Sequence, residues 1–369
     1  MLFIELCKSV IIQIGICQGE DDMKGTRIKA IMFAFLAAVF YAVNIPVSKL
    51  LLRHVDETMM AALLYLGAGI GISILSIISS KSRSGVEKLN QNDLPYVVGM
   101  VVLDIAAPIL LMTGISRGSS ANASLLGNFE IVATTLIALI LFGEVVSKRL
   151  WIAISLITVS SIMLGFEGKE SFSFSTGSVL VLAATVCWGL ENNCTRKIST
   201  KSTYEIVIIK GFFSGLGALC IAFMRHESFP ELKYMAAVLL LGFVAYGLSI
   251  FLYVRAQRDL GAAKTSAYYA VAPFVGSFLS FVFLHEQLSW MYLIALMIMI
   301  AGSVLVVIDT LIHNHEHAHQ HIFSHTHDGY THQHTITHTH GHNHYVTDEK
   351  HRHSLQELEL EPGALHDNN

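Results

Sequence analysis

Ten apolar stretches, each long enough to cross a lipid bilayer, follow one another along almost the whole chain. A transmembrane helix needs about 17 to 25 mainly apolar residues. Stretches of this kind lie near residues 30–52, 58–79, 94–115, 121–142, 149–166, 176–195, 204–224, 234–255, 263–284 and 288–311. Only 14% of the 369 residues are charged, against roughly a quarter in a soluble domain. We therefore expect an all-α membrane protein with ten transmembrane helices and no soluble catalytic domain.

The second half of the chain repeats the first. The segments FGEVVS (142–147) and LHEQLS (284–289) each close one apolar stretch and open the next, 142 residues apart. Nearer the start of each half, an offset of 147 pairs Tyr41 with Trp188 and Asn44 with Glu191. Each half holds five predicted helices, so the second copy enters the membrane from the opposite side. The sequence thus predicts two inverted five-helix repeats, residues 28–168 and 174–311.

Motifs in both halves resemble those of a known transporter family. The segments SSANASLL (119–126) and FGEVVS (142–147) are similar to the first EamA-type domain of the drug/metabolite transporter superfamily. The segments GAAKTSA (261–267), VAPF (271–274) and LHEQLS (284–289) are similar to the second. The resemblance implies two inverted repeats around a central cavity and alternating access. The family usually has a proline midway along this helix, which is Pro273 in the second half but Ile131 in the first, so the sequence does not predict a symmetric kink.

The expected function is that of a secondary transporter, most simply an exporter of a small metabolite or amino-acid-like solute across the cytoplasmic (inner) membrane. A divalent metal exporter of Zn, Ni or Co, fed by a His-rich tail, is the alternative, although His54, His226 and His285 all lie in predicted loops. A membrane-embedded enzyme or sensor fits less well, because the helices hold no Cys/His/Asp constellation. The expected partners are a small solute and the lipid bilayer. A divalent metal and a homodimer stay open, and no nucleic acid is expected.

Four charged residues fall inside the predicted helices: Asp104, Glu130, Glu191 and Lys210. Each costs about 2.5–3.5 kcal/mol at a helix centre on insertion scales, so intramembrane charges are functional candidates. Lys210 can neutralise one acid as a buried pair but not all three. At least two acids must therefore be protonated, hydrated in a cavity or paired with a cationic solute. Two amides join these charged residues as candidates, because Asn128 lies two residues before Glu130 and Asn44 aligns with Glu191 in the repeat. The candidate solute-binding residues are therefore Asn44, Asp104, Asn128, Glu130, Glu191 and Lys210.

Two further groups of residues carry weaker signals. Glu144 and Glu286 lie at the ends of predicted helices, where we expect them to cap a helix or anchor a loop. Tyr246, Tyr268 and Tyr269 are candidates for the aromatic wall of a cavity, although ordinary packing is the better explanation for any single one.

The Lys and Arg residues predict the orientation in the membrane. If the segment before the first helix is cytoplasmic, fourteen of them fall in cytoplasmic loops and six in outer loops. Cytoplasmic loops of membrane proteins carry the excess of Lys and Arg. Both termini are therefore expected in the cytoplasm.

Residues 1–27 precede the first predicted helix. Their apolar patch around Ile11 and Ile12 is too short to span a membrane, and Glu5 and Lys8 do not form the basic start of a signal peptide. Met23 opens a basic segment. A short interfacial leader and a translation start at Met23 both remain open.

The last segment, residues 312–369, has an entirely different composition. It holds sixteen of the nineteen histidines, most of them at alternate positions. We expect a disordered cytoplasmic tail whose imidazoles bind Zn, Ni, Co or Cu, since neutral imidazole suits these metals. A passive extension without a role is the alternative, and the membrane unit itself is expected to require no cofactor. The candidate metal ligands are His315, His317, His319, His321, His332, His334, His338, His340, His342 and His344.

Overall fold

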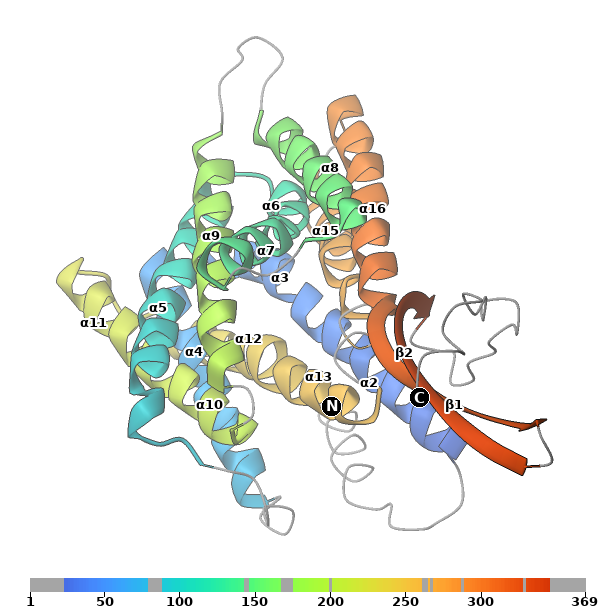
Figure 1. The fold of residues 1–369 in the computed structure, drawn as a ribbon. Helices are drawn as coiled ribbons and strands as arrows, with labels where there is room; N and C mark the ends of the chain where they lie inside the picture. The colour runs from blue at the N-terminus through green and yellow to red at the C-terminus, as the bar shows by residue number, and fades with distance from the viewer. Residues whose placement is uncertain are drawn as a thin grey trace.

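The computed structural model describes residues 23–78, 88–142, 146–166, 175–198, 201–260, 265, 268–286, 289–327 and 330–345. These residues form a bundle of α-helices followed by a two-stranded antiparallel sheet (Figure 1). The leader before Met23 and the tail beyond Tyr345 lie outside the described residues.

The helices of the first half follow the predicted order. They are α2 (Met23–Ala42), α3 (Asn44–Leu51), α4 (Glu57–Ile78), the 3-10 turn Gln91–Asp93, α5 (Leu94–Arg117), α6 (Ser120–Leu126), α7 (Phe129–Phe142) and α8 (Lys148–Gly165). The first predicted helix is thus divided into α2 and α3 at Val43, and the fourth into α6 and α7.

The helices of the second half mirror this order. They are α9 (Thr176–Ile198), α10 (Thr203–Ile209), the π turn η3 (Lys210–Ser214), α11 (Gly215–Met224), α12 (Leu232–Gly242), the π turn η4 (Phe243–Leu248), α13 (Ser249–Leu260), α15 (Ala272–Leu284) and α16 (Trp290–Leu311). The strands β1 (Ile312–His327) and β2 (Tyr330–Tyr345) follow.

Eight helical segments of the described chain are long and apolar enough to cross a membrane by length and composition. Two of the ten predicted stretches fall outside this set. The helix α9 has 23 residues, but its second half contains Glu191, Asn192 and Asn193, which lower its hydropathy. The helix α15 is apolar but has only 13 residues.

The two halves pack through the same set of helix pairs. The helix α5 packs on α9, and α13, at the equivalent place in the second half, packs on α2. Likewise α7 packs on α9, and α15 packs on α2. The helix α4 packs on α10 and α11, and α8 packs on α16, so these helices meet their own copies (Figure 1). Exchanging the two halves leaves this set of contacts unchanged.

Atomic contacts between α8 and α16 show the relative direction of the copies. Ser160 Oγ donates a hydrogen bond of 2.6 Å to the carbonyl oxygen of Ala295. At the offset of 142, Ser160 aligns with Gly302 and Ala295 with Ala153. A Cβ placed on Gly302 would lie 3.2 Å from the carbonyl oxygen of Ala153. The same contact is therefore made twice, and the two equivalent helices run antiparallel.

The contact of α4 with η3 and α11 depends on small residues. A Cβ on Gly211 would collide with the backbone of Gly69, and one on Gly215 would lie 2.9 Å from the backbone nitrogen of Leu66. Small residues of this kind allow two helix backbones to approach closely in a membrane. The helix contact is thus one of backbone against backbone.

We expect Gly211→Val to lower the free energy of unfolding by about 1–3 kcal/mol, because overpacking forces the backbones apart. Gly217→Ala is the matched control, since its Cβ would meet only the side chain of Ile105, which can move. The midpoint of thermal unfolding in detergent measures both variants. Equal midpoints for Gly211→Val and the wild type would show that this helix contact tolerates a larger spacing.

The fourth and ninth helices are interrupted at nearly the same place. A turn at Gly127 and Asn128 separates α6 from α7, and a turn at Ala270 and Val271 precedes α15. These turns lie within one residue of the positions that the offset of 142 predicts. Pro273 lies in the first turn of α15, whereas glycine and asparagine, both weak helix formers, occupy the break in the first half. The symmetric break therefore exists although only one half has the proline.

The His-rich segment is a β-hairpin over residues 312–345 rather than the disordered extension predicted from its composition. Its strands pair antiparallel, with Ile312 opposite Tyr345 and His327 opposite Tyr330. Histidine alternates with Thr, Ile and other residues, and such a period of two favours a strand. The Asp-Gly pair at 328–329 is a typical hairpin turn sequence; its own structure lies outside the described residues.

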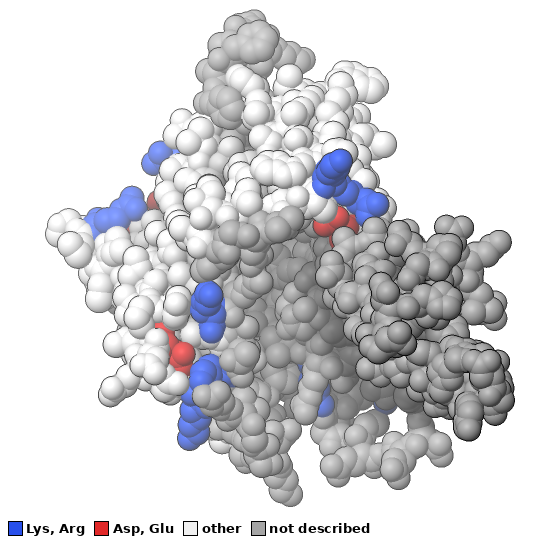
Figure 2. All heavy atoms as spheres, in the orientation of Figure 1, with Lys and Arg blue, Asp and Glu red and all other residues white. Residues whose placement is uncertain are grey.

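The described surface is largely uncharged. On the face shown in Figure 2, Lys, Arg, Asp and Glu side chains are few and scattered. Large apolar side chains are exposed on several helices, among them Ile77, Ile140, Phe278 and Met297. An extensive apolar surface marks an interaction with lipid or protein, and its distribution over many helices fits a bilayer.

Candidate functional site: a central cavity between the two halves

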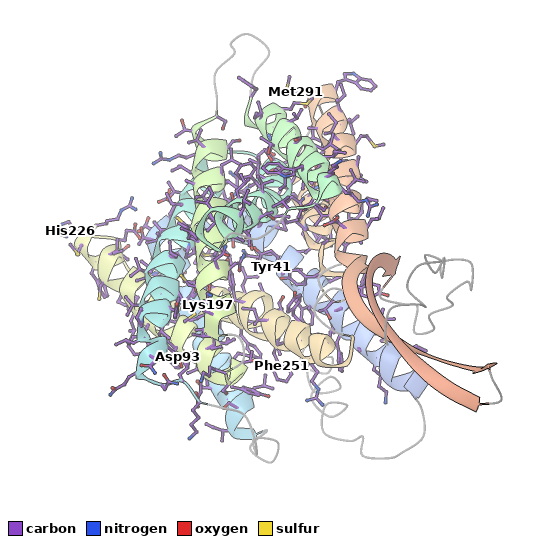
Figure 3. All side chains as sticks on the ribbon, viewed as in Figure 1. Tyr41, Asp93, Lys197, His226, Phe251 and Met291 are labelled. Carbon is purple, nitrogen blue, oxygen red and sulfur yellow. The ribbon has the colours of Figure 1, made fainter. Side chains whose placement is uncertain are left out.

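A cavity of about 680 Å³ lies between the two halves of the bundle. Its lining includes Tyr41 from α2, Glu130 from α7, Trp188 from α9 and Tyr246 from η4. In Figure 3, Tyr41 lies near the middle of the molecule, between regions that hold Asp93 and Met291 toward opposite ends. Both repeats therefore contribute to one central space.

Most of the residues predicted to bind solute line this cavity. They are Asp104, Asn128, Glu130, Glu191 and Lys210. Asn44 is fully buried and lies behind the lining. Its Nδ2 donates a hydrogen bond of 3.1 Å to the hydroxyl of Tyr246, and its Oδ1 accepts one from Ser48. Asn44 therefore contacts a lining tyrosine and is not itself among the lining residues.

Lys210 bridges two of the three acids that line the cavity. Its Nζ lies 2.8 Å from Oε1 of Glu191 and 3.2 Å from Oδ2 of Asp104. The hydroxyl of Tyr65 donates a hydrogen bond of 2.9 Å to Oδ1 of Asp104, and Thr195 donates one to Glu191. We refer to Asp104, Glu191 and Lys210 as the ion triad. The triad has two carboxyl groups for one ammonium group. Lys210 therefore contacts two acids at once, whereas the sequence suggested a pair with one acid.

Two π turns position cavity residues that sequence reasoning could not place. Lys210 begins η3, and Tyr246 lies within η4. A π turn adds one residue to a helical turn and is frequent at functional sites. Their counterparts in the first half, α4 and α5, are α-helical throughout. The two halves therefore differ locally where they present these two side chains.

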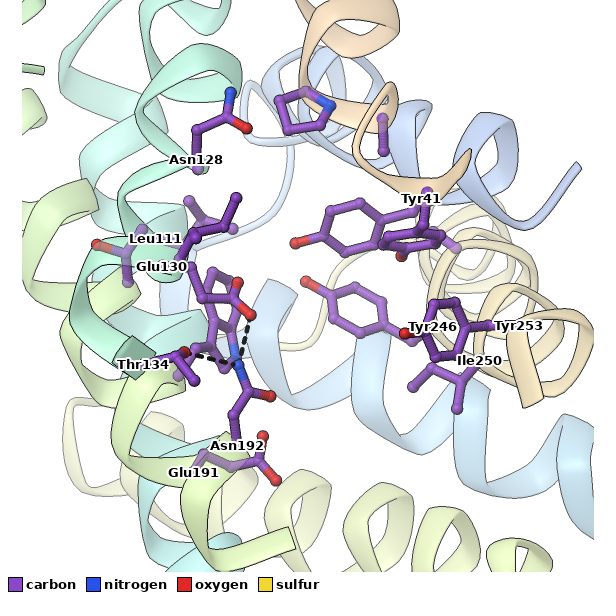
Figure 4. A pocket seen from close by; sticks show the side chains of 18 of the residues that line it. Tyr41, Leu111, Asn128, Glu130, Thr134, Glu191, Asn192, Tyr246, Ile250 and Tyr253 are labelled. Atoms are coloured by element: carbon purple, nitrogen blue, oxygen red, sulfur yellow. Dashed lines mark hydrogen bonds between the residues drawn. The ribbon is translucent and has the colours of Figure 1, made fainter. Parts of the chain in front are cut away.

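Glu130 lies apart from the ion triad on the same wall. Asn192 Nδ2 donates a hydrogen bond of 2.7 Å to Oε1 of Glu130 and lies 3.3 Å from Oγ1 of Thr134 (Figure 4). Among the described residues, neither Lys nor Arg forms an ion pair with Glu130. The Asn192 amide holds one carboxyl oxygen, and the carboxyl group borders the cavity.

Tyrosines form the opposite wall. In Figure 4 the labelled rings of Tyr41, Tyr246 and Tyr253 lie across the cavity from Glu130. The ring centroid of Tyr41 is 6.2 Å from that of Tyr246 and 5.9 Å from that of Tyr269, and Tyr253 is 5.1 Å from Tyr269. We call these four residues the tyrosine wall. The structure thus presents acids on one side of the cavity and aromatic rings on the other.

The sequence predicted part of this wall. Tyr246 and Tyr269 line the cavity as expected, whereas Tyr268, 37% exposed, is not among the lining residues. Tyr41 and Tyr253 were not predicted. The repeat offset contained the signal for the first of them, because it aligns Tyr41 with Trp188, and both side chains line the cavity.

Glu286 caps a helix of the other half. Its carboxylate accepts hydrogen bonds from the backbone nitrogens of Ser120 (2.7 Å) and Ala121 (2.9 Å) and from Oγ of Ser119 (2.7 Å). These donors belong to the first turn of α6, where a carboxylate satisfies free N–H groups. The predicted capping role is confirmed for Glu286. Its repeat counterpart, Glu144, lies outside the described residues.

No group of three or more His, Cys, Asp or Glu side chains suited to a metal ion occurs among the residues that the structure describes. The side chains of the hairpin lie outside this description. Its backbone register places His315 opposite His342 and His317 opposite His340. The predicted metal ligands of the tail therefore stay predictions.

A helical membrane bundle with two equivalent halves and a shared internal cavity defines the chain as a membrane transporter. The chain matches the EamA-like transporter family over residues 28–166 and 175–308. It belongs to this family.

The chain is similar to two relatives described as uncharacterized transporters. It is 25% identical over 303 residues to one from Methanothermobacter thermautotrophicus, covering 77% of this chain and 87% of the relative. It is 21% identical over 276 residues to YyaM of Bacillus subtilis, covering 70% and 87%. A protein of known crystal structure shares the fold with a TM-score of 0.56 at 16% identity, covering 76% of this chain and 96% of the other.

Proposed function

We propose that the protein is a secondary transporter that exports a small metabolite or amino-acid-like solute across the cytoplasmic membrane by alternating access. The observation that carries this proposal is the cavity of about 680 Å³ with Asp104, Glu130, Glu191 and Lys210 on its lining. Its volume falls within the range of roughly 300–1,000 Å³ that is typical of small-molecule sites. Buried charges that border a cavity inside a membrane protein usually mark a substrate or ion pathway.

In this proposal ten helices cross the membrane, five in each of two inverted repeats. The helix α9 crosses despite its polar second half, because Glu191 and Asn192 border the cavity instead of lipid. The helix α15 completes the ninth crossing together with the residues that precede it, among which Thr265, Tyr268 and Tyr269 are described and helical. The antiparallel contact of α8 with α16 supports the inverted arrangement.

The repeat geometry supports alternating access. Because the helix pairs are the same after exchange of the two halves, a rocking of one half against the other can open the cavity first to one side and then to the other. The hydrogen bonds of Glu286 to Ser120 and Ala121 join the two halves on one side of the cavity. Such contacts must break and re-form during the cycle.

A fluorescent protein fused to the C-terminus is expected to fluoresce, and alkaline phosphatase fused there to be inactive, because the Lys and Arg excess of fourteen to six favours the cytoplasmic side. Paired fusions of alkaline phosphatase and a fluorescent protein measure the side. Phosphatase activity in the periplasm would overturn the proposed orientation.

The function itself is tested by reconstitution. Purified full-length protein is reconstituted into sealed vesicles that are loaded with a mixed metabolite extract. The solutes that leave the vesicles are identified by mass spectrometry. We expect a small set of solutes to leave faster than from protein-free vesicles. Equal loss of every solute in both preparations would contradict the proposed function.

We further propose that the His-rich hairpin binds divalent metal ions such as Zn, Ni, Co or Cu as a module separate from the cavity. Alternating imidazoles support this, since neutral imidazole is a common ligand of these metals. Binding requires neutral imidazole, so affinity should fall below about pH 6 as groups with a reference pKa of roughly 6.5 become protonated.

Deleting residues 313–369 is expected to leave folding and metabolite efflux unchanged, because the described helices end at Leu311. Metal binding by equilibrium dialysis should be lost, and thermal unfolding and efflux should match the full chain. If the deletion instead abolished Zn or Ni tolerance of cells and vesicles showed metal flux, the metal-exporter alternative would replace the metabolite exporter.

A further inference from the structure

The charge balance of the cavity favours a cation. Three carboxyl groups, those of Asp104, Glu130 and Glu191, line it together with one ammonium group, that of Lys210. Lys210 already lies between Asp104 and Glu191 at 3.2 Å and 2.8 Å. The described lining therefore holds more acid than its own cation can balance.

Glu130 is the acid positioned to meet a solute. It borders the cavity and accepts one hydrogen bond, at Oε1, from Asn192 Nδ2. That amide also lies 3.3 Å from Thr134 Oγ1, which fixes its direction. A carboxylate held by an amide keeps its second oxygen for another donor. In Figure 4 the carboxyl group lies on the side of the cavity that faces the tyrosines.

The tyrosine wall offers aromatic faces to an organic ammonium group on the side opposite Glu130. Tyr41 and Tyr246 have ring centroids 6.2 Å apart at an angle of 77°, and Tyr41 and Tyr269 are 5.9 Å apart at 41°. The rings therefore meet at angles rather than as a flat stack. Aromatic faces attract cations, and cages of several rings recognise alkylammonium groups.

We propose, building on the proposed transport function, that the cavity selects solutes that carry an ammonium group. Glu130 is the counter-ion of that group, and the tyrosine wall packs around its alkyl part. Solutes that carry only a carboxylate are excluded by the acid excess of the lining. The remainder of the solute occupies the rest of the cavity, whose lining is mainly apolar, as with Leu111 and Ile250.

Three probes of nearly equal size test this selectivity: phenethylammonium, phenethyl alcohol and phenylpropionate, whose polar ends are a cationic ammonium, a neutral hydroxyl and an anionic carboxylate. Binding to the purified full-length protein is measured by equilibrium dialysis in detergent at neutral pH. Phenethylammonium is expected to bind more tightly than either other probe, by on the order of tenfold. Equal or weaker binding of phenethylammonium, including no binding of any probe, would overturn the proposal.

Variants assign the preference to the named residues. Glu130→Gln keeps an acceptor for Asn192 but removes the charge, so it should reduce the preference for phenethylammonium over phenethyl alcohol to about one, and Glu130→Asp should restore part of it. Tyr41→Leu should weaken ammonium binding severalfold, whereas Tyr41→Phe keeps the ring and should weaken it less. Glu231→Gln is the control, because Glu231 is exposed, pairs with Lys233 and is not among the cavity-lining residues. An unchanged preference in folded Glu130→Gln would place the ammonium site elsewhere and overturn the proposal.

Solute efflux from the reconstituted vesicles, together with the binding of phenethylammonium, distinguishes failure of this inference from failure of the proposed function. If efflux selects anionic or neutral solutes only, the transport function stands and the ammonium site falls. If phenethylammonium binds through Glu130 but no solute leaves the vesicles faster than without protein, the site stands and the transport function falls.

Discussion

Lys210→Met is expected to leave little folded protein in the membrane. The side chains of Asp104 and Glu191 are 1% and 4% exposed, and both lie within 3.2 Å of the ammonium group of Lys210. Without that group, two like charges remain buried and unpaired. Removing one partner of a buried ion pair typically lowers the free energy of unfolding by about 3–5 kcal/mol. Yield of monodisperse protein and the midpoint of thermal unfolding in detergent measure the effect.

Neutralising the whole ion triad should restore folding. The triple variant Asp104→Asn, Glu191→Gln and Lys210→Met removes the charges together, and such replacements of buried ionic groups are often neutral or stabilising. Lys233→Met is the control, because Lys233 is exposed and pairs with the equally exposed Glu231; its unfolding midpoint should not change. A wild-type midpoint for Lys210→Met alone would show that the acids are neutral without the lysine and that the triad is not an ionic unit.

Glu130→Gln is expected to fold normally but to reduce solute efflux on the order of tenfold to a hundredfold, the range that corresponds to the loss of a hydrogen bond to a charged group. Glutamine keeps an oxygen that accepts from Asn192, so the local packing is retained. Initial rates of efflux from vesicles, normalised to the amount of reconstituted protein, measure the change. Glu231→Gln should keep the wild-type rate. Wild-type efflux in Glu130→Gln would leave Glu130 a structural role only.

The overall architecture could be predicted because membrane helices are specified by length and composition. Ten apolar stretches and the repeated loop at Glu144 and Glu286 indicate two five-helix halves, and the structure has two halves with the same helix pairs. The break in the fourth helix was not predicted, because only Pro273 was considered a cause. The helix is interrupted at Gly127 and Asn128, because glycine and asparagine both have a low helix propensity.

The site could be predicted where burial of charge is costly and therefore informative. Asp104, Glu130, Glu191 and Lys210 stand out in apolar stretches, and the structure places all four on one cavity. Tyr41 does not stand out in this way, because aromatic residues are common in membrane helices. Asn44, predicted to bind the solute, donates a hydrogen bond to a lining tyrosine and is not itself among the lining residues, since an alignment of repeats predicts a depth in the membrane and not the direction of a side chain.

The hairpin of residues 312–327 and 330–345 was not predicted from the composition of the His-rich segment. Composition predicts that a His-rich segment cannot form a buried core, but it does not exclude regular strands. The alternation from Ile312 to Tyr345 favours backbone pairing that requires no core.

The most direct test of the central claim measures from which side of the membrane a reagent can reach the cavity. This measurement requires no knowledge of the solute. Thr135, on the cavity lining, is replaced by cysteine in a full-length protein whose native cysteines Cys7, Cys17, Cys187 and Cys194, together with Cys220, are replaced by serine or alanine. A membrane-impermeant thiol reagent is applied to right-side-out and inside-out vesicles.

Alternating access predicts that Cys at position 135 is labelled in both vesicle preparations, while the vesicles stay impermeable to the reagent itself. Labelling from one side only, in intact protein with normal insertion, would contradict a transporter that carries its solute through this cavity.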